Sequence, residues 1–202
     1  DKLIAIHGKE NIDSTSKGRL VCLNIPTEYP AEQIVLTPDA EAWRNDDHIG
    51  FTSSPILVKD RVYTTNFTGE PIAVNAADGK TAWHTKTAPD QIHASPIHGD
   101  GKIYAPFFEG TFAIVDEQGK VLSKAEIKDE SGSGVKALAA PIIWAGKVYL
   151  STRDGLYCFG DKDRDYKTNK GTDEKDTLGE VAQLQIVPAE FAIAPGKTQG
   201  FK

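Results

Sequence analysis

The stretch Ser54–Thr85, SPILVKDRVYTTNFTGEPIAVNAADGKTAWHT, decides the fold of this chain. It contains four short apolar runs, at residues 55–58, 61–65, 71–75 and 81–84. Turn residues separate these runs, namely Lys59-Asp60, Gly69-Glu70 and Asp78-Gly79-Lys80. Asp-Gly pairs and isolated glycines supply the positive φ that tight hairpins need. Four short runs with such turns between them predict a small antiparallel meander.

The same unit recurs twice further along the chain. A proline opens the first strand of each copy, a tyrosine lies in the second strand, and a glycine marks the next turn. The markers are Pro55, Pro96 and Pro141; Tyr63, Tyr104 and Tyr149; and Gly69, Gly110 and Gly155. Every marker moves by 41 residues from the first copy to the second and by 45 from the second to the third. A period of about 40 to 45 with four strands per unit is typical of a β-propeller blade.

We therefore predict an all-β fold, with residues 1–160 forming a partial β-propeller of about three and a half four-stranded antiparallel blades and a short β segment at the C-terminus. The expected blade boundaries lie near residues 1–49, 50–90, 91–135 and 136–160. The first blade lacks its opening strand, because Asp1–Ile6 already matches a second strand. It also carries insertions at His7–Lys17 and Ile25–Ala42. Insertions in repeat proteins map to one face, often the binding face.

The repeat pattern stops after Phe159. Residues 161–180 are rich in Asp, Lys, Thr and Gly, which predicts a polar linker. Residues 181–187 largely alternate with period two, and 191–193 continue the pattern. Residues 181–202 are therefore either the last propeller strand with a tail or the start of a second β domain, and the sequence leaves both open.

Composition limits the classes of partner. The chain has 23 basic and 29 acidic residues and no basic run, so we expect no nucleic-acid partner. No apolar segment approaches about 18 residues, so we expect no membrane span. The chain contains no methionine and begins at Asp1 within the repeat pattern, which suggests a processed or truncated piece. Because a closed propeller needs about 4 to 8 blades, we expect its partners to include the remaining blades, from the same chain or a companion fragment.

The segment from Ala73 to Trp83, AVNAADGKTAW, resembles the Ala-x-Asp-x-x-x-Gly-x-x-x-Trp motif of the PQQ-like, or quinoprotein-type, propeller repeats, with Asn75 where that family usually has Asp. The resemblance covers about residues 1–160. It implies that Trp43, Gly79 and Trp83 dock neighbouring blades, whereas the next blade has no Trp in this place. The chain resembles non-enzymatic members of this family, similar to the propeller lipoprotein that assists outer-membrane protein assembly, and the resemblance implies a secreted, periplasmic or cell-envelope location.

Five histidines raise the question of metal binding. Asp46, Asp47 and His48 form the most suggestive cluster, since two carboxylates and an imidazole before a strand could bind a cation. The alternative is a solvated loop between blades, which we favour. The other histidines are scattered, which is more typical of surface residues or hydrogen-bond partners between blades.

Two cysteines, Cys22 and Cys158, are too few for a thiolate metal site. By motif they align with Ala73 and Ala113, in the third-strand position that takes a small residue, where free cysteine acts as a small hydrophobe. A quinoprotein dehydrogenase commonly has a vicinal disulfide, and this chain has no adjacent cysteine pair. We expect no cofactor; PQQ and calcium apply only if the chain is a fragment of such an enzyme.

The favoured function is a non-catalytic binding or scaffold module with a protein partner, and no catalytic residue is assigned. The alternative is a fragment of a PQQ-dependent dehydrogenase, and a weaker third possibility is a carbohydrate-surface binder. Asn66-Phe67-Thr68 and Phe107-Phe108-Glu109 lie at equivalent turns, where exposed aromatics form a recognition surface or pack between blades. We place any function in irregular parts, at the loops 7–17 and 25–48.

Overall fold

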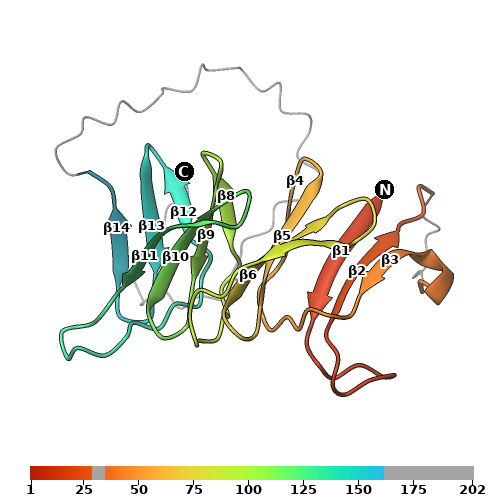
Figure 1. Cartoon of the computed structure of the whole chain (residues 1–202), viewed down its shortest axis with the longest axis horizontal. Helices are drawn as coiled ribbons and strands as arrows, with labels where there is room; N and C mark the ends of the chain where they lie inside the picture. Colours follow the sequence, from red (N-terminus) through yellow and green to blue (C-terminus); the bar gives the residue numbers. More distant parts are fainter. Residues whose placement is uncertain (29–34, 162–202) are drawn as a thin grey trace, which may run out of the picture. The chain divides into compact units, whose positions relative to one another are not determined.

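The computed structural model describes residues 1–28 and 35–161, so the predictions for residues 162–202 lie outside the described residues. The described chain forms four small antiparallel sheets, one after another along the sequence (Figure 1). The first sheet contains β1 (Lys2–His7), β2 (Arg19–Asn24) and β3 (Glu41–Asn45), with the short 3-10 helix η1 (Pro38–Ala40) before β3. The second contains β4 (Ile56–Val58), β5 (Arg61–Asn66), β6 (Glu70–Asn75) and β7 (Thr81–His84). The third contains β8 (Ile97–Gly99), β9 (Lys102–Pro106), β10 (Thr111–Asp116) and β11 (Val121–Glu126), and the fourth contains β12 (Ile142–Trp144), β13 (Lys147–Ser151) and β14 (Leu156–Phe159).

Each sheet is a simple meander in which consecutive strands pair. The first sheet begins with the counterpart of a second strand, and the fourth, in its described part, ends with the counterpart of a third strand. The predicted all-β fold with propeller-type blades is therefore confirmed, and we call the four sheets the first to fourth blades.

The hairpin turn between the first two strands of a blade has a similar backbone conformation in the second, third and fourth blades. Lys59, Asp100 and Ala145 hold equivalent positions and have φ of 55°, 51° and 49°. These values are in the left-handed region, which most non-glycine residues avoid. At the second and third of these turns Gly101 and Gly146 follow with φ of 68° and 73°, which gives the pair of positive φ angles of a type I′ hairpin.

Apolar clusters lie between neighbouring blades and hold them together. Leu20, Cys22 and Trp43 of the first blade pack with Val62 and Ile72 of the second. Between the second and third blades the cluster is Tyr63, Ala73, Ile103 and Val115, with Ile56, Val58 and Trp83 packed against it. Between the third and fourth blades it includes Tyr104, Phe112, Val135 and Leu150. The core of this repeat is therefore made between the sheets rather than within one sheet.

The strand register corrects one part of the sequence alignment. Cys22 pairs with Trp43, and Ala73 pairs with Trp83, each beside a β-bulge. In the third blade the residue at this bulge is Ile114, which pairs with Ser123. The alignment of Ala113 with Ala73 was therefore wrong by one residue. The cause is the last turn of the blade, where Asp116 N donates to Lys120 O, whereas Asn75 N donates to Lys80 O across one residue more.

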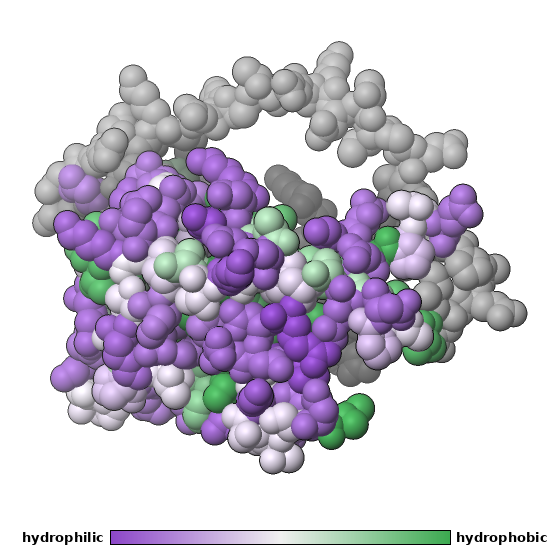
Figure 2. Space-filling model, turned by 45° about the vertical axis from the view of Figure 1, so that its right-hand side comes forward, coloured by the Kyte–Doolittle hydropathy of each residue, from purple (hydrophilic) through white to green (hydrophobic). Residues whose placement is uncertain are grey.

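The face of the described residues shown in Figure 2 is mainly hydrophilic. In the view of Figure 2 hydrophobic residues form small separate patches among hydrophilic ones. None of the helices in residues 1–28 and 35–161 has the length and apolarity that a membrane crossing requires.

Candidate functional site

Trp43 is placed at the junction of the first and second blades. Its side chain is 8% exposed, and its Nε1 donates a hydrogen bond to the Ala76 carbonyl at 2.8 Å. Gly79 lies beneath the ring with φ of 70°, and a Cβ at this position would come within 2.3 Å of Trp43 Cε3. The ring therefore occupies space that only glycine leaves open.

Trp83 makes the same contact one blade further on. Its Nε1 donates to the Glu117 carbonyl at 2.9 Å, and a Cβ on Gly119 would lie 2.6 Å from Trp83 Cδ2. Trp83 is less buried than Trp43. Both tryptophans of these two blades thus have their indole N–H and one ring face engaged by the next blade.

Asp46, Asp47 and His48 are adjacent in sequence but contact different partners. The Asp46 carboxylate accepts a hydrogen bond from Arg19 Nε at 3.1 Å, and Asp47 donates its backbone N–H to Asn45 Oδ1. His48 is 6% exposed and its Nε2 lies 2.7 Å from Thr81 Oγ1 of the second blade. Within the described ranges, no group of three His, Cys, Asp or Glu side chains is arranged to hold a metal ion.

Burial determines the protonation of His48. Desolvation lowers the pKa of its imidazole below the ordinary value, and the neighbouring Asp47 carboxylate opposes this effect only in part. His48 is therefore better described as a neutral hydrogen-bonding residue between two blades than as an exposed base.

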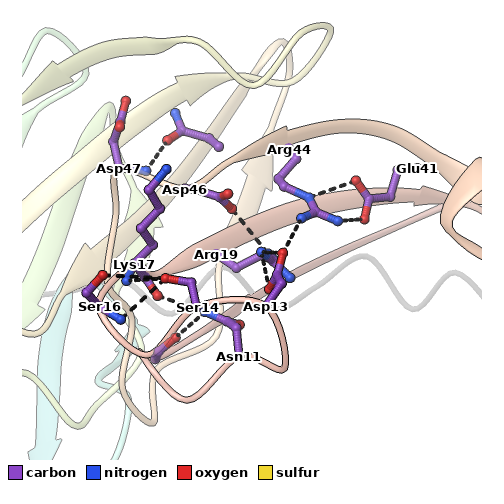
Figure 3. Close-up of polar contacts among 12 residues, drawn as sticks. Asn11, Asp13, Ser14, Ser16, Lys17, Arg19, Glu41, Arg44, Asp46 and Asp47 are labelled. Carbon is purple, nitrogen blue, oxygen red and sulfur yellow. Dashed lines mark hydrogen bonds and ion pairs between the residues drawn. The ribbon is translucent and has the colours of Figure 1, made fainter.

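The insertion between β1 and β2 is held by a polar network (Figure 3). Asn11 Nδ2 donates to the carbonyls of Gly8 and Lys17, at 3.2 and 2.7 Å, and closes the loop on itself. Arg19 then bridges the loop to the end of β3, because it donates to both Asp13 oxygens and to Asp46. These bonds raise the pKa of the Arg19 guanidinium and keep its positive charge fixed. The network gives the loop a defined conformation without presenting a reactive group.

A second cluster consists of aromatic side chains beside this loop. Four side chains, which we call the aromatic ledge, form a continuous row: Phe67, Phe51, His93 and Phe108. The ring centroids are 5.9 Å apart for Phe67 and Phe51, 4.6 Å for Phe51 and His93, and 4.5 Å for His93 and Phe108. Phe51 is 48% exposed. The row joins the second blade to the third on the side where the second and third strands are connected.

Equivalent backbone hydrogen bonds position the two phenylalanines at the ends of the row. Phe67 N donates to the Ile49 carbonyl at 2.7 Å, and Phe108 N donates to the Gln91 carbonyl at 2.9 Å. In each case the turn between the second and third strands is attached to the segment that precedes the opening strand of the same blade. The ledge is thus a product of the repeat and not of a single loop.

Two grooves lie along the ledge and share Phe67. One has a volume of about 480 Å³ and is lined by His7, Lys9, Ile49, Phe51 and Phe67 among others. The other, of about 530 Å³, is lined by Phe67, Lys86, Asp90, Gln91 and Phe108 among others.

Lysines and a partly buried carboxylate surround the grooves. Lys9 Nζ lies 5.7 Å from the Phe67 centroid and Lys136 Nζ lies 4.8 Å from the Phe108 centroid, which are cation–π distances. Asp90 accepts the backbone N–H groups of Gln91 and Glu109. Burial raises the pKa of the Asp90 carboxyl, and these hydrogen bonds oppose the shift. The grooves therefore combine an apolar wall with a polar rim of both charges.

Part of this ledge was predicted from the sequence, because Phe67 and Phe108 lie in the two turns that were expected to expose aromatic residues. Phe107, which is in the same turn as Phe108, is instead fully buried in a central cluster. Phe51 and His93 were not identified. A weak signal was available, since both lie just before the opening strand of a repeat. Their contact depends on tertiary bonds such as Thr52 Oγ1 to the His93 carbonyl, at 2.7 Å.

The two features expected of a quinone site, a stacking tryptophan and a set of metal ligands, were compared with the described residues. Gly79 covers one face of the Trp43 ring and Gly119 covers one face of the Trp83 ring, so each ring has a structural contact with the next blade. Trp144 is 60% exposed, but no group of three acidic, His or Cys side chains that could hold an ion lies among the described residues. We therefore derive no chemistry through such a group.

Comparisons with known proteins identify one matching family and several solved structures of similar fold. A family profile described as outer membrane protein assembly factor BamB matches residues 15–193. Among solved structures, BamB from Moraxella catarrhalis is similar at 16% identity and a TM-score of 0.51, with 78% of this chain and 50% of that chain covered. Quinohemoprotein alcohol dehydrogenase from Comamonas testosteroni is similar at 17% identity and a TM-score of 0.50, with 75% and 31% covered.

A computationally designed protein, Ika4, is similar at 14% identity and a TM-score of 0.53, with 78% of this chain and 90% of that chain covered. At these identities the likeness is one of fold. The chain spans about half the length of the Moraxella protein and about a third of the Comamonas enzyme. No curated protein matches the chain.

Proposed function

The chain belongs to the outer membrane protein assembly factor BamB family, and from this membership we propose that it is a non-catalytic, polypeptide-binding module of the cell envelope. The contact surface in this proposal is the aromatic ledge. The observation that carries it is Phe51, a large apolar side chain that is 48% exposed and contacts Phe67 in a tilted and His93 in an edge-to-face arrangement.

The chemistry of the ledge favours a polypeptide ligand. Aromatic side chains dominate the binding energy of protein interfaces, where they are surrounded by polar residues that exclude water. The ledge has this composition, because Phe51 and Phe67 line a groove with Lys9 and Glu10 at its rim. A groove on either side of Phe67 offers space for side chains of one extended segment.

A carbohydrate is the less suitable ligand. Sugars stack on free aromatic faces, whereas Lys9 lies over the Phe67 ring and Lys136 over the Phe108 ring. A quinone-dependent reaction has no observation in its favour, because the likeness to the dehydrogenase is one of fold, and folds of this kind carry many functions.

The proposal can be tested with a urea-denatured outer-membrane porin, labelled with a fluorophore and diluted into buffer with the full chain. We expect saturable binding by fluorescence anisotropy. The double variant Phe51→Ser, Phe67→Ser should weaken binding by about tenfold or more, since two aromatic contacts are lost. The matched control is Leu57→Ser, which removes a side chain that is 60% exposed and outside the ledge.

Absence of binding, or an equal loss in the control variant and in the ledge variant, would contradict the proposal. Circular dichroism of each variant shows whether the blades remain folded, so a loss of binding can be assigned to the surface.

A further inference from the structure

A polar groove lies between the second and third blades, at the end of the sheets opposite the aromatic ledge. It has a volume of about 390 Å³ and is bordered by the β4–β5 hairpin and the β10–β11 turn. In an antiparallel meander these two kinds of turn lie at one end of the sheet, and the turns of the ledge, between second and third strands, lie at the other. We propose that this groove binds a small zwitterionic peptide, with its carboxylate at the β4–β5 hairpin and its ammonium group at Glu117.

The wall of the groove contains a buried hydroxyl that is available to a ligand. Tyr63 is only 2% exposed and lines the groove. Within residues 1–28 and 35–161 its hydroxyl has no hydrogen-bond partner, whereas buried tyrosine hydroxyls usually have one. The hydroxyl is not enclosed by protein, unlike the unpartnered Oγ1 of Thr64. Its small exposed area therefore faces the groove.

Docking of the blades does not require these polar groups, as the junction of the first and second blades shows. Ile4 has the place of Tyr63 in the register of the first blade. Ala76 has the place of Glu117, because the backbone carbonyl of each accepts the indole N–H of the preceding blade's tryptophan. The first junction is thus formed with an isoleucine and an alanine where the second has a hydroxyl and a carboxylate. Ligand binding accounts for the difference between them.

The third blade supplies the negative charge of the groove. Glu117 Oε1 lies 2.8 Å from His98 Nε2, and the His98 ring lies parallel to the Tyr63 ring at 6.2 Å between centroids. These contacts fix the carboxylate beside the buried hydroxyl. Burial raises the pKa of the Tyr63 hydroxyl and the Glu117 charge adds to this shift, so the hydroxyl remains a donor. A ligand ammonium group can thus be bound by Glu117 while Tyr63 donates to a ligand oxygen.

The β4–β5 hairpin of the second blade supplies the positive charge. Arg61 Nη1 lies 3.5 Å from the Asp60 carboxylate and also donates to Asn75. Lys59 is exposed and has no ion-pair partner among the described residues. The hairpin therefore has one cation in excess at the rim of the groove.

Size and charge together select a small zwitterion. The groove volume of about 390 Å³ is within the range of small-molecule pockets, about 300–1,000 Å³. A ligand that carries one charge would be attracted at one rim and repelled at the other, whereas a ligand with an ammonium group and a carboxylate satisfies both. Trp83 also borders the groove, and an ammonium group gains further from an aromatic ring.

Dialanine with both termini free is the probe, and the indole N–H signals of the full chain, labelled with ¹⁵N at tryptophan, are the readout. The chain has three tryptophans, and the Trp83 signal is identified by its loss in Trp83→Phe. Because the Trp83 N–H donates to the Glu117 carbonyl, its signal reports on the groove. We expect a saturable shift of this signal with a Kd of the order of 1 mM. Trp43 is the internal control, and its signal should not shift.

Matched ligands and variants separate the three contacts. N-acetyl-dialanine lacks the ammonium group and dialanine amide lacks the carboxylate, and each should bind about tenfold more weakly. Glu117→Gln should weaken dialanine binding by a similar factor but leave N-acetyl-dialanine unaffected. Tyr63→Phe should weaken binding about fivefold and leave the urea midpoint unchanged, because the hydroxyl has no partner to lose. Tyr104→Phe, at the equivalent position of the third blade, is the control and should bind normally.

Absence of a Trp83 shift at about 50 mM dialanine, well above the expected Kd, would overturn the proposal. Equal binding of the three ligands would also overturn it, and so would a lower urea midpoint in Tyr63→Phe, which would assign the hydroxyl a structural role. The proposal does not depend on the aromatic ledge, because the groove and the ledge share no residue. Phe51→Ser should therefore leave dialanine binding unchanged, and failure at this groove would leave the porin result intact.

Discussion

Replacement of Gly79 by alanine is the most specific test of how the blades dock. The added Cβ would lie 2.3 Å from Trp43 Cε3 and within 2.9 Å of two further ring atoms, so the ring must move. Alanine in the left-handed region costs about 1–2 kcal/mol, and restriction of the unfolded chain returns about 0.4–1 kcal/mol. Displacement of a packed ring adds about 1–3 kcal/mol. We expect Gly79→Ala to lower the free energy of unfolding by about 1–5 kcal/mol.

The chain supplies a matched control at Gly101. Its φ of 68° is close to the 70° of Gly79, but a Cβ there would meet nothing within 4 Å. Gly101→Ala therefore carries the backbone cost without the clash, and the difference between the two variants, about 1–3 kcal/mol, is the contribution of the Trp43 contact.

Urea unfolding should be followed by far-ultraviolet circular dichroism, because tryptophan fluorescence would report on the displaced ring itself. If Gly79→Ala were no more destabilising than Gly101→Ala within about 0.5 kcal/mol, the ring would not be held as described, and our account of blade docking would be refuted.

Three further predictions concern the same repeat. Gly119→Ala should destabilise the chain in the same way, because its Cβ would lie 2.6 Å from the Trp83 ring; urea midpoints test this, and a neutral result would contradict it. The pKa of His48 is lowered by burial, so near and below the ordinary pKa of histidine the unfolded state binds more protons than the folded state. The free energy of unfolding should therefore fall as pH drops from 7.5 to 5.5, with a slope of at most about 1.4 kcal/mol per pH unit. In His48→Asn the slope should be smaller, and an unchanged slope would assign the pH dependence to other groups. Ala145→Asn should stabilise the chain by about 0.5–1 kcal/mol, because asparagine tolerates the left-handed φ of 49° and forms the Asn-Gly pair that type I′ turns favour; a lower thermal midpoint would argue against this.

Most of the fold could be predicted because it depends on local features of the sequence, namely turn residues and short apolar runs. Turn glycines and short apolar runs recur at fixed spacing, so strand order followed from the sequence. The register did not follow completely, since the last turn of the third blade is one residue shorter than that of the second, and the residue equivalent to Ala73 beside the bulge is Ile114 rather than Ala113. A change of one residue in a turn is invisible when only the strands are aligned.

Only part of the candidate site could be predicted, and the reason differs from that for the strand register. Phe67 and Phe108 lie in equivalent turns and were recognisable from the repeat. Phe51 and His93 lie in irregular segments, and their positions depend on hydrogen bonds to residues distant in sequence. The cluster Asp46-Asp47-His48 is a cluster in sequence only, because Arg19 engages the first carboxylate and Thr81 the imidazole. Residues that are adjacent in sequence can form one metal site only if their side chains point toward the same point in space, and these side chains contact different partners.

Hydrogen-exchange mass spectrometry of the chain with and without bound denatured porin can show whether the aromatic ledge is the binding surface, because it maps the contact surface without a substitution. We expect slower exchange in the four segments that carry the ledge, at residues 49–52, 66–69, 90–94 and 107–110. Slower exchange confined to other segments, with these four unchanged, would contradict the claim that the aromatic ledge is the binding surface.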